Sequence, residues 1–240
     1  MERRTLLLDL LKQVHEMEMN FVDALSGQER ARIGTLEDWS AKDVISHITA
    51  RKALMADSLL ALSEARSLTG SEDLDHENAI LFKEYHDKTW DEVLRLAADA
   101  FRIVVAQVES LGEQELARCV KFFPWQGERP MWRLIVGSGY IHPIAHMAEF
   151  HRNRGDRERA GKMIGEMARS MVGLDDGSVW QGDVKYNLAC HYSLLGAKAE
   201  AIRELQESLV LDAGLTDWSK EDPDLEAIRG EPEYQAIYKS

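Results

Sequence analysis

The sequence predicts an all-α protein. Apolar residues recur every three to four positions over long stretches, as they do along one face of an amphipathic helix. All five prolines lie in the second half of the chain, so no proline interrupts a helix before Pro124. No segment alternates apolar and polar residues in the manner of a half-buried strand. Several long helices without strands favour a helical bundle.

The first two helices are expected over residues 3–24 and from Ser40 onward. Residues 26–38, with two glycines, separate them as a connection. Ser40 and Asp43 match a capping box, in which the hydroxyl and the carboxylate each accept an otherwise unpaired backbone N–H. The two apolar stripes consist of Leu6, Leu7, Leu10, Val14, Met17 and Phe21, and of Val44, Ile48, Met55, Leu59 and Leu62.

Two further long helices follow. Residues 67–77 are polar and predict a loop, and residues 79–85 predict a short helix. Thr89 and Glu92 form a second capping box at the start of the third long helix. Residues 119–129 predict an aromatic-rich loop, and Pro130 suits the first turn of a fourth helix that ends near Gly155. These helices predict a four-helix bundle with a long crossover between the second and third.

The chain changes character after Gly155, which predicts domains at residues 1–154 and 155–240. Residues 157–172 predict a helix. In residues 183–215, small and large residues alternate on both sides of Gly196 in a way that suits a helix–turn–helix hairpin. This segment resembles one tetratricopeptide repeat, although Ala213 stands where that family usually has proline. Short closing helices are expected in the remaining tail.

Composition excludes several classes of protein. The apolar fraction of 45% and the charged fraction of 30% are typical of a folded globular chain. The net charge of −13, with no basic block, argues against nucleic-acid binding. The amino-terminal residues resemble an amphipathic helix rather than a signal peptide, and no apolar run is long enough to span a membrane. We therefore expect a cytoplasmic protein. Its two cysteines lie far apart and predict no disulfide framework.

Three histidines predict a metal site. His142 and His146 share one face of the fourth helix because residues four apart lie one above the other. His47 lies beside the apolar stripe of the second helix. A single pair with this spacing arises readily by chance, and an isolated inward histidine is usually a core residue with a hydrogen bond. Three clustered imidazoles are harder to bury in that way, whereas a metal ion pairs all of them.

The motif Trp-Ser-x-Lys-Asp-Val-x-x-His at residues 39–47, together with His142 and His146, resembles the DinB superfamily. Residues 78–85, Thr89 to Val93, and the run Phe-Pro-Trp-Gln-Gly at 123–127 add a likeness to its ClbS/DfsB branch. The resemblance covers residues 1–153 and implies a four-helix bundle with a pocket at one end. In metal-binding members a histidine triad holds a divalent ion. The matching residues here are His47, His142 and His146.

An open three-histidine site suits catalysis, because at least one coordination position remains for water or a thiol. Imidazole ligands favour zinc or nickel. Glu149, one turn after His146, is the candidate general acid or base, with an orienting role as the alternative. Tyr140 and His151 are weaker choices. Aromatic residues for an apolar pocket are Trp125, Trp132 and Phe150, although such residues more often form core. Pro143 predicts a kink that Gly139 relieves.

The expected function is therefore a metal-dependent hydrolase or thiol transferase acting on a small reactive metabolite, and the resemblance to the ClbS/DfsB branch implies a protective role. The alternative is a non-catalytic or metal-free binding or adaptor protein that uses the tetratricopeptide-like segment for protein interaction. A small-molecule substrate follows from the first reading. A homodimer remains open, and neither a nucleic acid nor a membrane is expected as a partner.

Overall fold

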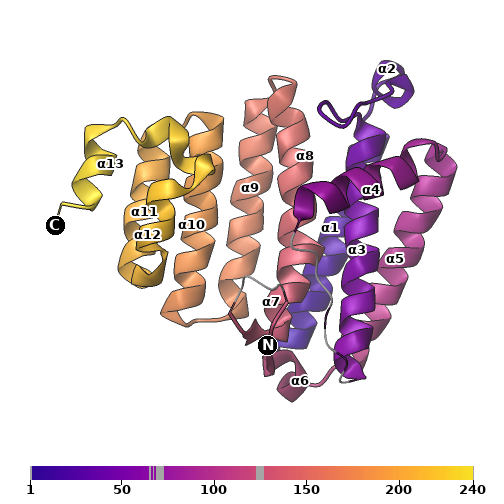
Figure 1. Ribbon diagram of the computed structural model, residues 1–240, viewed down its shortest axis with the longest axis horizontal. Helices are drawn as coiled ribbons and strands as arrows, with labels where there is room; N and C mark the ends of the chain where they lie inside the picture. Colours follow the sequence, from indigo (N-terminus) through magenta and orange to yellow (C-terminus); the bar gives the residue numbers. More distant parts are fainter. Residues whose placement is uncertain (1, 65, 67, 69–72, 123–126, 240) are drawn as a thin grey trace. The chain divides into compact units, whose positions relative to one another are not determined.

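The computed structural model describes residues 2–64, 66, 68, 73–122 and 127–239. Over these residues the protein is all-α, as the sequence predicts, and its strands are only two residues long (Figure 1). The chain divides into two compact units, Met1–Phe150 and His151–Ser240, and the boundary falls within one helix. No helix in the described part of the chain is both long and apolar enough to cross a membrane.

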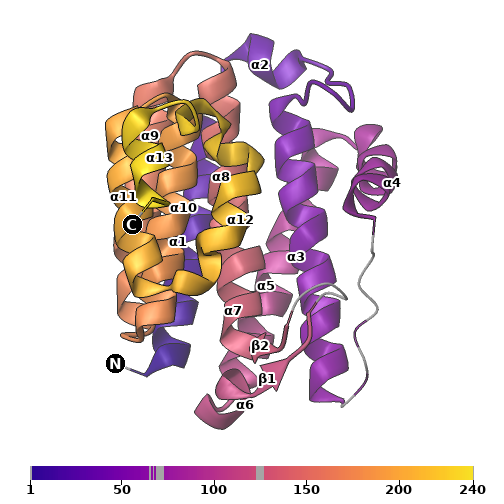
Figure 2. The same ribbon diagram turned by 60° about the vertical axis from the view of Figure 1, so that its left-hand side comes forward.

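The three longest helices of the first unit, α1 (Arg3–Asp23), α3 (Ala41–Ser63) and α5 (Trp90–Ser110), lie side by side (Figures 1 and 2). Helix α3 packs against α4 and α5, α1 packs against α5, and the π-helical turn η1 packs against α1 and α3. Helices α7, η1 and α8 follow one another without a break. The elements are α1 (Arg3–Asp23), α2 (Gly27–Ala31), α3 (Ala41–Ser63), α4 (Leu74–His86), α5 (Trp90–Ser110), α6 (Glu113–Ala117), β1 (Cys119–Val120), β2 (Arg129–Pro130), α7 (Met131–Val136), η1 (Gly137–Ile141) and α8 (His142–Asn153).

Local sequence signals place the ends of these helices. The Ser40 hydroxyl accepts the Asp43 backbone N–H and the Asp43 carboxylate accepts the Ser40 N–H at 2.8 Å, so the capping box starts α3 as predicted. Thr89 and Glu92 do the same for α5. Pro130 precedes α7, and Gly155, with a φ of +82°, follows α8. Most residues of the predicted apolar stripes are buried between the helices; Leu7, Val14, Ile48 and Met55 are at most 2% exposed, whereas Leu6 and Met17 are partly exposed.

Three connecting segments differ from the predictions. Residues 26–38 contain the short helix α2, which Ser26 and Glu29 cap. Helix α4 begins at Leu74, inside the predicted loop at 67–77, and the helix expected at 79–85 is therefore longer. The Asp73 carboxylate caps it by accepting the His76 N–H. The start of α4 is polar and exposed, so it lacks the apolar periodicity that reveals a buried helix. The loop predicted at 119–129 has paired ends, β1 with β2, while residues 123–126 lie outside the described residues.

The second unit is built on a hairpin of α10 and α11, and α9 packs against α10. Gly196 makes the turn with a φ of +78°, a backbone conformation that other residues adopt at a cost. Ala189, Ala201 and Leu205 are fully buried where the two helices meet. Its elements are α9 (Arg157–Met171), η2 (Val172–Leu174), α10 (Ser178–Leu195), α11 (Lys198–Leu211), η3 (Ala213–Leu215), α12 (Thr216–Glu221), η4 (Pro223–Ile228) and α13 (Pro232–Ile237).

Candidate metal centre

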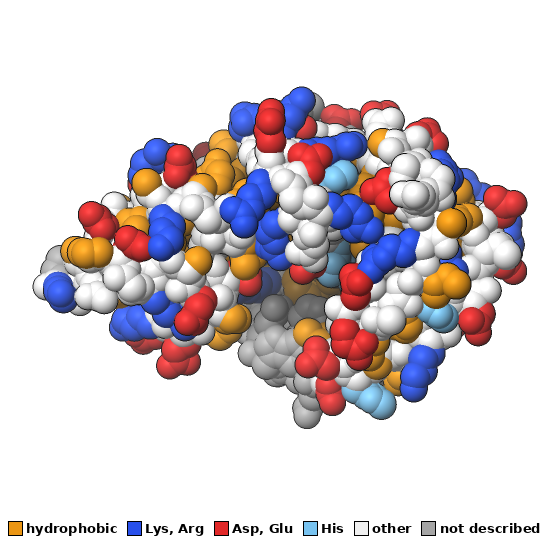
Figure 3. Space-filling model, turned by 90° about the horizontal axis from the view of Figure 1, so that it is seen from above, with side chains coloured by type: hydrophobic (Ala, Val, Ile, Leu, Met, Phe, Trp, Pro, Cys, Tyr) orange, Lys and Arg blue, Asp and Glu red, His pale blue; other side chains and the backbone are white. Residues whose placement is uncertain are grey.

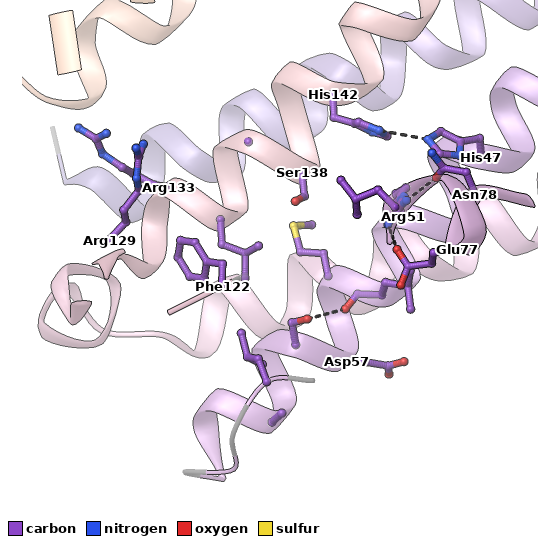
Figure 4. A pocket seen from close by; sticks show the side chains of 18 of the residues that line it. His47, Arg51, Asp57, Glu77, Asn78, Phe122, Arg129, Arg133, Ser138 and His142 are labelled. Atoms are coloured by element: carbon purple, nitrogen blue, oxygen red, sulfur yellow. Dashed lines mark hydrogen bonds and ion pairs between the residues drawn. The ribbon is translucent and has the colours of Figure 1, made fainter. Parts of the chain in front are cut away.

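The structure brings the three predicted histidines together. His47 Nε2 lies 3.1 Å from His142 Nε2, and His146 Nε2 lies 3.0 Å from the same atom. One ligand nitrogen from each ring lies within 4.8 Å of the others. His47 and His142 point toward one another from α3 and α8 in Figure 4. The site therefore joins two helices that are far apart in the sequence.

A π-helical turn precedes His142. The His142 N–H donates to the Gly137 carbonyl, five residues earlier, instead of the usual four. Pro143 explains the wider turn, because it has no N–H for the Gly139 carbonyl and its ring would crowd that carbonyl in a regular helix. The π-helical turn lies at the position where the sequence predicts a kink. A Cβ at position 139 would lie 2.7 Å from a methyl of Leu11, so a larger residue there would force this buried side chain to shift.

Burial keeps two of the three rings, those of His47 and His142, uncharged. The His47 side chain is 7% exposed, and desolvation lowers its pKa from 6.5 to about 3, with smaller effects from His146 and Arg51. The pKa of His142 also lies well below its usual value, again mainly because of burial, with His146 and His47 adding to the effect. Both rings are therefore neutral near pH 7 and offer a lone pair on one nitrogen.

Hydrogen bonds alone satisfy this cluster poorly. A neutral imidazole has one N–H and one acceptor nitrogen, yet His142 Nε2 faces both His47 Nε2 and His146 Nε2. If that atom carries a proton, it donates to only one of the two neighbouring nitrogens. If it carries a lone pair, it accepts from only one of them. An ion bound by all three lone pairs removes the conflict. Two nitrogens at about 2.0–2.1 Å from one ion lie roughly 2.9–3.4 Å apart, and the observed separations fall in this range. The donor set thus fits a divalent ion.

Glu149 does not face the cluster directly. Its Oε2 lies 3.6 Å from His146 Nδ1, the ring nitrogen on the side away from His142. This separation is longer than a hydrogen bond; a carboxylate that closed to hydrogen-bond distance here would fix the tautomer and orientation of a metal-binding histidine. None of the three candidates for acid–base chemistry, Glu149, Tyr140 and His151, lines the cavity that the histidines border. The Tyr140 hydroxyl donates to Gln13 at 3.2 Å, and His151 is 9% exposed.

Trp39 and Arg51 also belong to the site. Trp39 begins the motif at residues 39–47, but sequence reasoning gave it no role in the site, and it did not select Arg51. The Trp39 ring lies 4.8 Å from His47 and 5.6 Å from His146 between centroids, and it covers one side of the cluster. Arg51 lies one turn after His47 and contacts Glu77 and Asn78 of α4 (Figure 4). The spacing of four residues from His47 was the signal for Arg51, because it places both side chains on one helix face.

A cavity of about 650 Å³ opens beside the histidines, all three of which line it. Phe122, Met55 and Leu134 give it apolar walls. Of the aromatic residues predicted for a pocket, Trp132 and Phe150 are instead buried in the core, and Trp125 lies outside the described residues. Figure 3 shows histidine side chains beside lysine and arginine side chains on one face of the molecule. A cavity of this size accommodates a small-molecule ligand.

A second group of metal-ligating residue types, in the second unit, has a structural explanation. The Asp222 carboxylate accepts the Tyr186 hydroxyl at 2.8 Å and the Asp224 N–H at 3.0 Å, and so caps η4. The Cys190 thiol lies 3.7 Å from the same carboxylate. Burial, followed by the charge of Asp222, raises the pKa of the thiol, whereas a metal requires the thiolate.

No known protein family, no curated protein and no solved structure matches this chain.

Proposed function

We propose that the protein is a DinB-like metalloenzyme, a hydrolase or thiol transferase that acts on a small reactive metabolite. The observation that carries this proposal is the convergence of three imidazole nitrogens on the wall of a cavity. Three protein ligands leave a coordination position open, which is typical of catalytic rather than structural metal sites. Zinc or nickel suits the nitrogen ligands.

Five residues of the site have roles in this proposal. His47, His142 and His146 hold the ion, and burial keeps the first two in the neutral form that binds metal. A bound divalent ion would supply Lewis acidity, which lowers the pKa of a water or thiol placed on it. Glu149 holds the ring of His146 in its binding tautomer, and Trp39 restricts water on one side of the cluster.

The finer architecture is part of the same proposal. Helices α1, α3, α5 and the run from α7 to α8 correspond to the four helices of a DinB-like bundle, with α4 in the long crossover. The α10–α11 hairpin corresponds to one tetratricopeptide repeat, and its turn at Gly196 and its buried Ala189 and Ala201 support that assignment.

Elemental analysis tests the metal site. The full chain is purified without affinity nickel or chelator, beside a His146→Ala variant and a His76→Ala control. His76 is an exposed histidine of α4 that does not line the cavity. We expect about one divalent ion per chain in the wild type and the control, and none in His146→Ala. No ion in any of them, even after incubation with zinc and nickel, contradicts the proposal and favours the adaptor function.

Glu149→Gln separates the two roles considered for this carboxylate. Loss of an orienting contact to a metal-binding histidine typically weakens metal affinity about 10- to 100-fold. A chelator competition titration measures that affinity. Unchanged affinity with lost turnover, once a substrate is known, would instead assign Glu149 to acid–base chemistry.

A further inference from the structure

Two polar side chains lie beside His47 on the wall of the cavity. Arg51 belongs to α3, one turn after His47, and Asn78 belongs to α4. Both line the cavity that the three histidines border, and Figure 4 shows them together next to His47. A ligand that reaches the histidine cluster through this cavity therefore passes Arg51 and Asn78.

Glu77 and Asn78 hold the Arg51 guanidinium in one position. One terminal nitrogen, Nη1, donates to the Glu77 carboxylate, and the other, Nη2, donates to the side-chain oxygen of Asn78. The Arg51 side chain is only 16% exposed, so water competes little for these bonds. The other N–H groups of the guanidinium remain as donors for a ligand. Because Glu77 balances the charge of Arg51, these donors are offered with little net charge.

The bond from Arg51 also sets the direction of the Asn78 amide. A guanidinium can only donate, so the atom of Asn78 that faces it is the oxygen and not the nitrogen. The amide nitrogen, on the same planar carbon, then points in another direction and carries two N–H groups. No residue in the described part of the chain accepts from it. Asn78 thus adds donors of fixed orientation to those of Arg51.

These donors suit a ligand oxygen that can only accept hydrogen bonds. The carbonyl oxygen of an acyl group has lone pairs and no proton. A permanent anion gains little from a guanidinium whose charge is already balanced, whereas an uncharged carbonyl group binds to its donors equally well. Negative charge that develops on the oxygen during a reaction strengthens the hydrogen bonds that it accepts.

We infer that Arg51 and Asn78 bind the carbonyl oxygen of an acyl substrate, which is an ester, a thioester or an amide, beside the histidine cluster. This inference rests on the proposed function, because it names the substrate class of the same site.

The same donors serve hydrolysis of such a substrate. Water adds to the carbonyl carbon, and the π electron pair of the C=O bond moves to the oxygen, which becomes an oxyanion. The C=O bond then forms again, the bond to the leaving alcohol, thiol or amine breaks, and that group departs with one proton of the water. Arg51 and Asn78 stabilise the oxyanion that exists between the two steps.

Binding of two probes of the same shape tests the inference. Acetophenone has a carbonyl oxygen, and in α-methylstyrene a methylene group replaces that oxygen. Neither compound has a hydrolysable bond. Each is titrated into the zinc-incubated full chain, and the NMR signal of the Met55 methyl group reports binding, because Met55 lines this cavity. A wild-type chain that does not bind acetophenone overturns the inference.

Asn78→Asp separates a ligand-binding role from a structural one. The new carboxylate still accepts from Arg51, so the link between α3 and α4 is kept, but an acceptor oxygen replaces the N–H donors. We expect acetophenone binding to weaken at least about fivefold and α-methylstyrene binding to change less than about twofold, with an unchanged thermal melt. Unchanged acetophenone binding, or an equal loss for both probes, overturns the inference.

Ser58→Asp is the matched control. It adds the same negative charge to the cavity wall, two turns after Arg51 on α3. We expect it to change the affinity for either probe less than about twofold, because it removes no donor from the proposed site. A loss of acetophenone binding equal to that in Asn78→Asp overturns the inference.

The His146→Ala variant distinguishes failure of this inference from failure of the proposed function. We expect acetophenone binding to persist in it and to remain sensitive to Asn78→Asp, because the donors belong to α3 and α4. Binding lost in His146→Ala and unchanged in Asn78→Asp means that the carbonyl oxygen binds the ion, which overturns the inference alone. Binding that depends on Asn78 in a wild-type chain that takes up no metal supports the carbonyl site and contradicts the metalloenzyme proposal.

Discussion

Lys52 and Glu18 form an ion pair inside the first unit. The Lys52 Nζ lies 2.5 and 2.7 Å from the two carboxylate oxygens, and both side chains are 3% exposed. Because Lys52→Met leaves the Glu18 charge buried without its partner, we expect it to lower the free energy of unfolding by about 3–5 kcal/mol. Lys52→Met combined with Glu18→Leu leaves no charge behind, and we expect the double variant to cost less than about 1 kcal/mol.

Hydrogen exchange read by mass spectrometry on peptides of α3 measures this effect in the first unit alone. A loss of about 3–5 kcal/mol speeds exchange of the most protected amides by roughly 100- to 4,000-fold. Lys12→Met is the matched control, because it removes the same charge from an exposed position on α1 and should change stability by less than about 0.5 kcal/mol. The reasoning is refuted if Lys52→Met costs less than about 1 kcal/mol, or if the double variant is as unstable as the single one.

Two further predictions concern the histidine cluster and the turn before it. The folded pKa of His47, about 3, lies below the unfolded value of 6.5, so the unfolded chain binds its proton first as the pH falls. The free energy of unfolding of the metal-free protein should therefore fall by a few kcal/mol as the pH is lowered from about 6.5 to about 3. Urea unfolding across this range checks it, and an equally steep loss in His47→Gln would contradict it. Gly139→Ala should lower the free energy of unfolding by about 1–3 kcal/mol, because the added Cβ would lie 2.7 Å from a methyl of Leu11 in α1. Gly137→Ala is the control, because a Cβ at this position of the same turn would meet no neighbouring side chain within 4 Å, and it should leave stability nearly unchanged. Equal urea midpoints for the two variants would exclude the close approach to Leu11 as the cause of the destabilisation.

Helices that bury an apolar face could be predicted from the sequence, whereas exposed polar helical segments could not. The extent of α1 follows from apolar spacing, and the starts of α3 and α5 follow from capping boxes; both signals depend on residues a few positions apart. The first turn of α4 was predicted as a loop because it is exposed and polar. In such a segment the periodicity of burial is absent, and the Asp73 cap was the sole local signal.

The sequence by itself determined the helical class and the one-sided placement of His142 and His146, because both follow from local periodicity. Only the tertiary structure decided that His47, 95 residues before His142, completes the cluster. It also decided that Glu149 contacts the outer nitrogen of His146, and that Asn78 of α4 accepts from Arg51 on the wall of the same cavity. The physical reason is that spacing along a helix specifies which face a residue occupies, whereas the partner of that face depends on how separate helices pack.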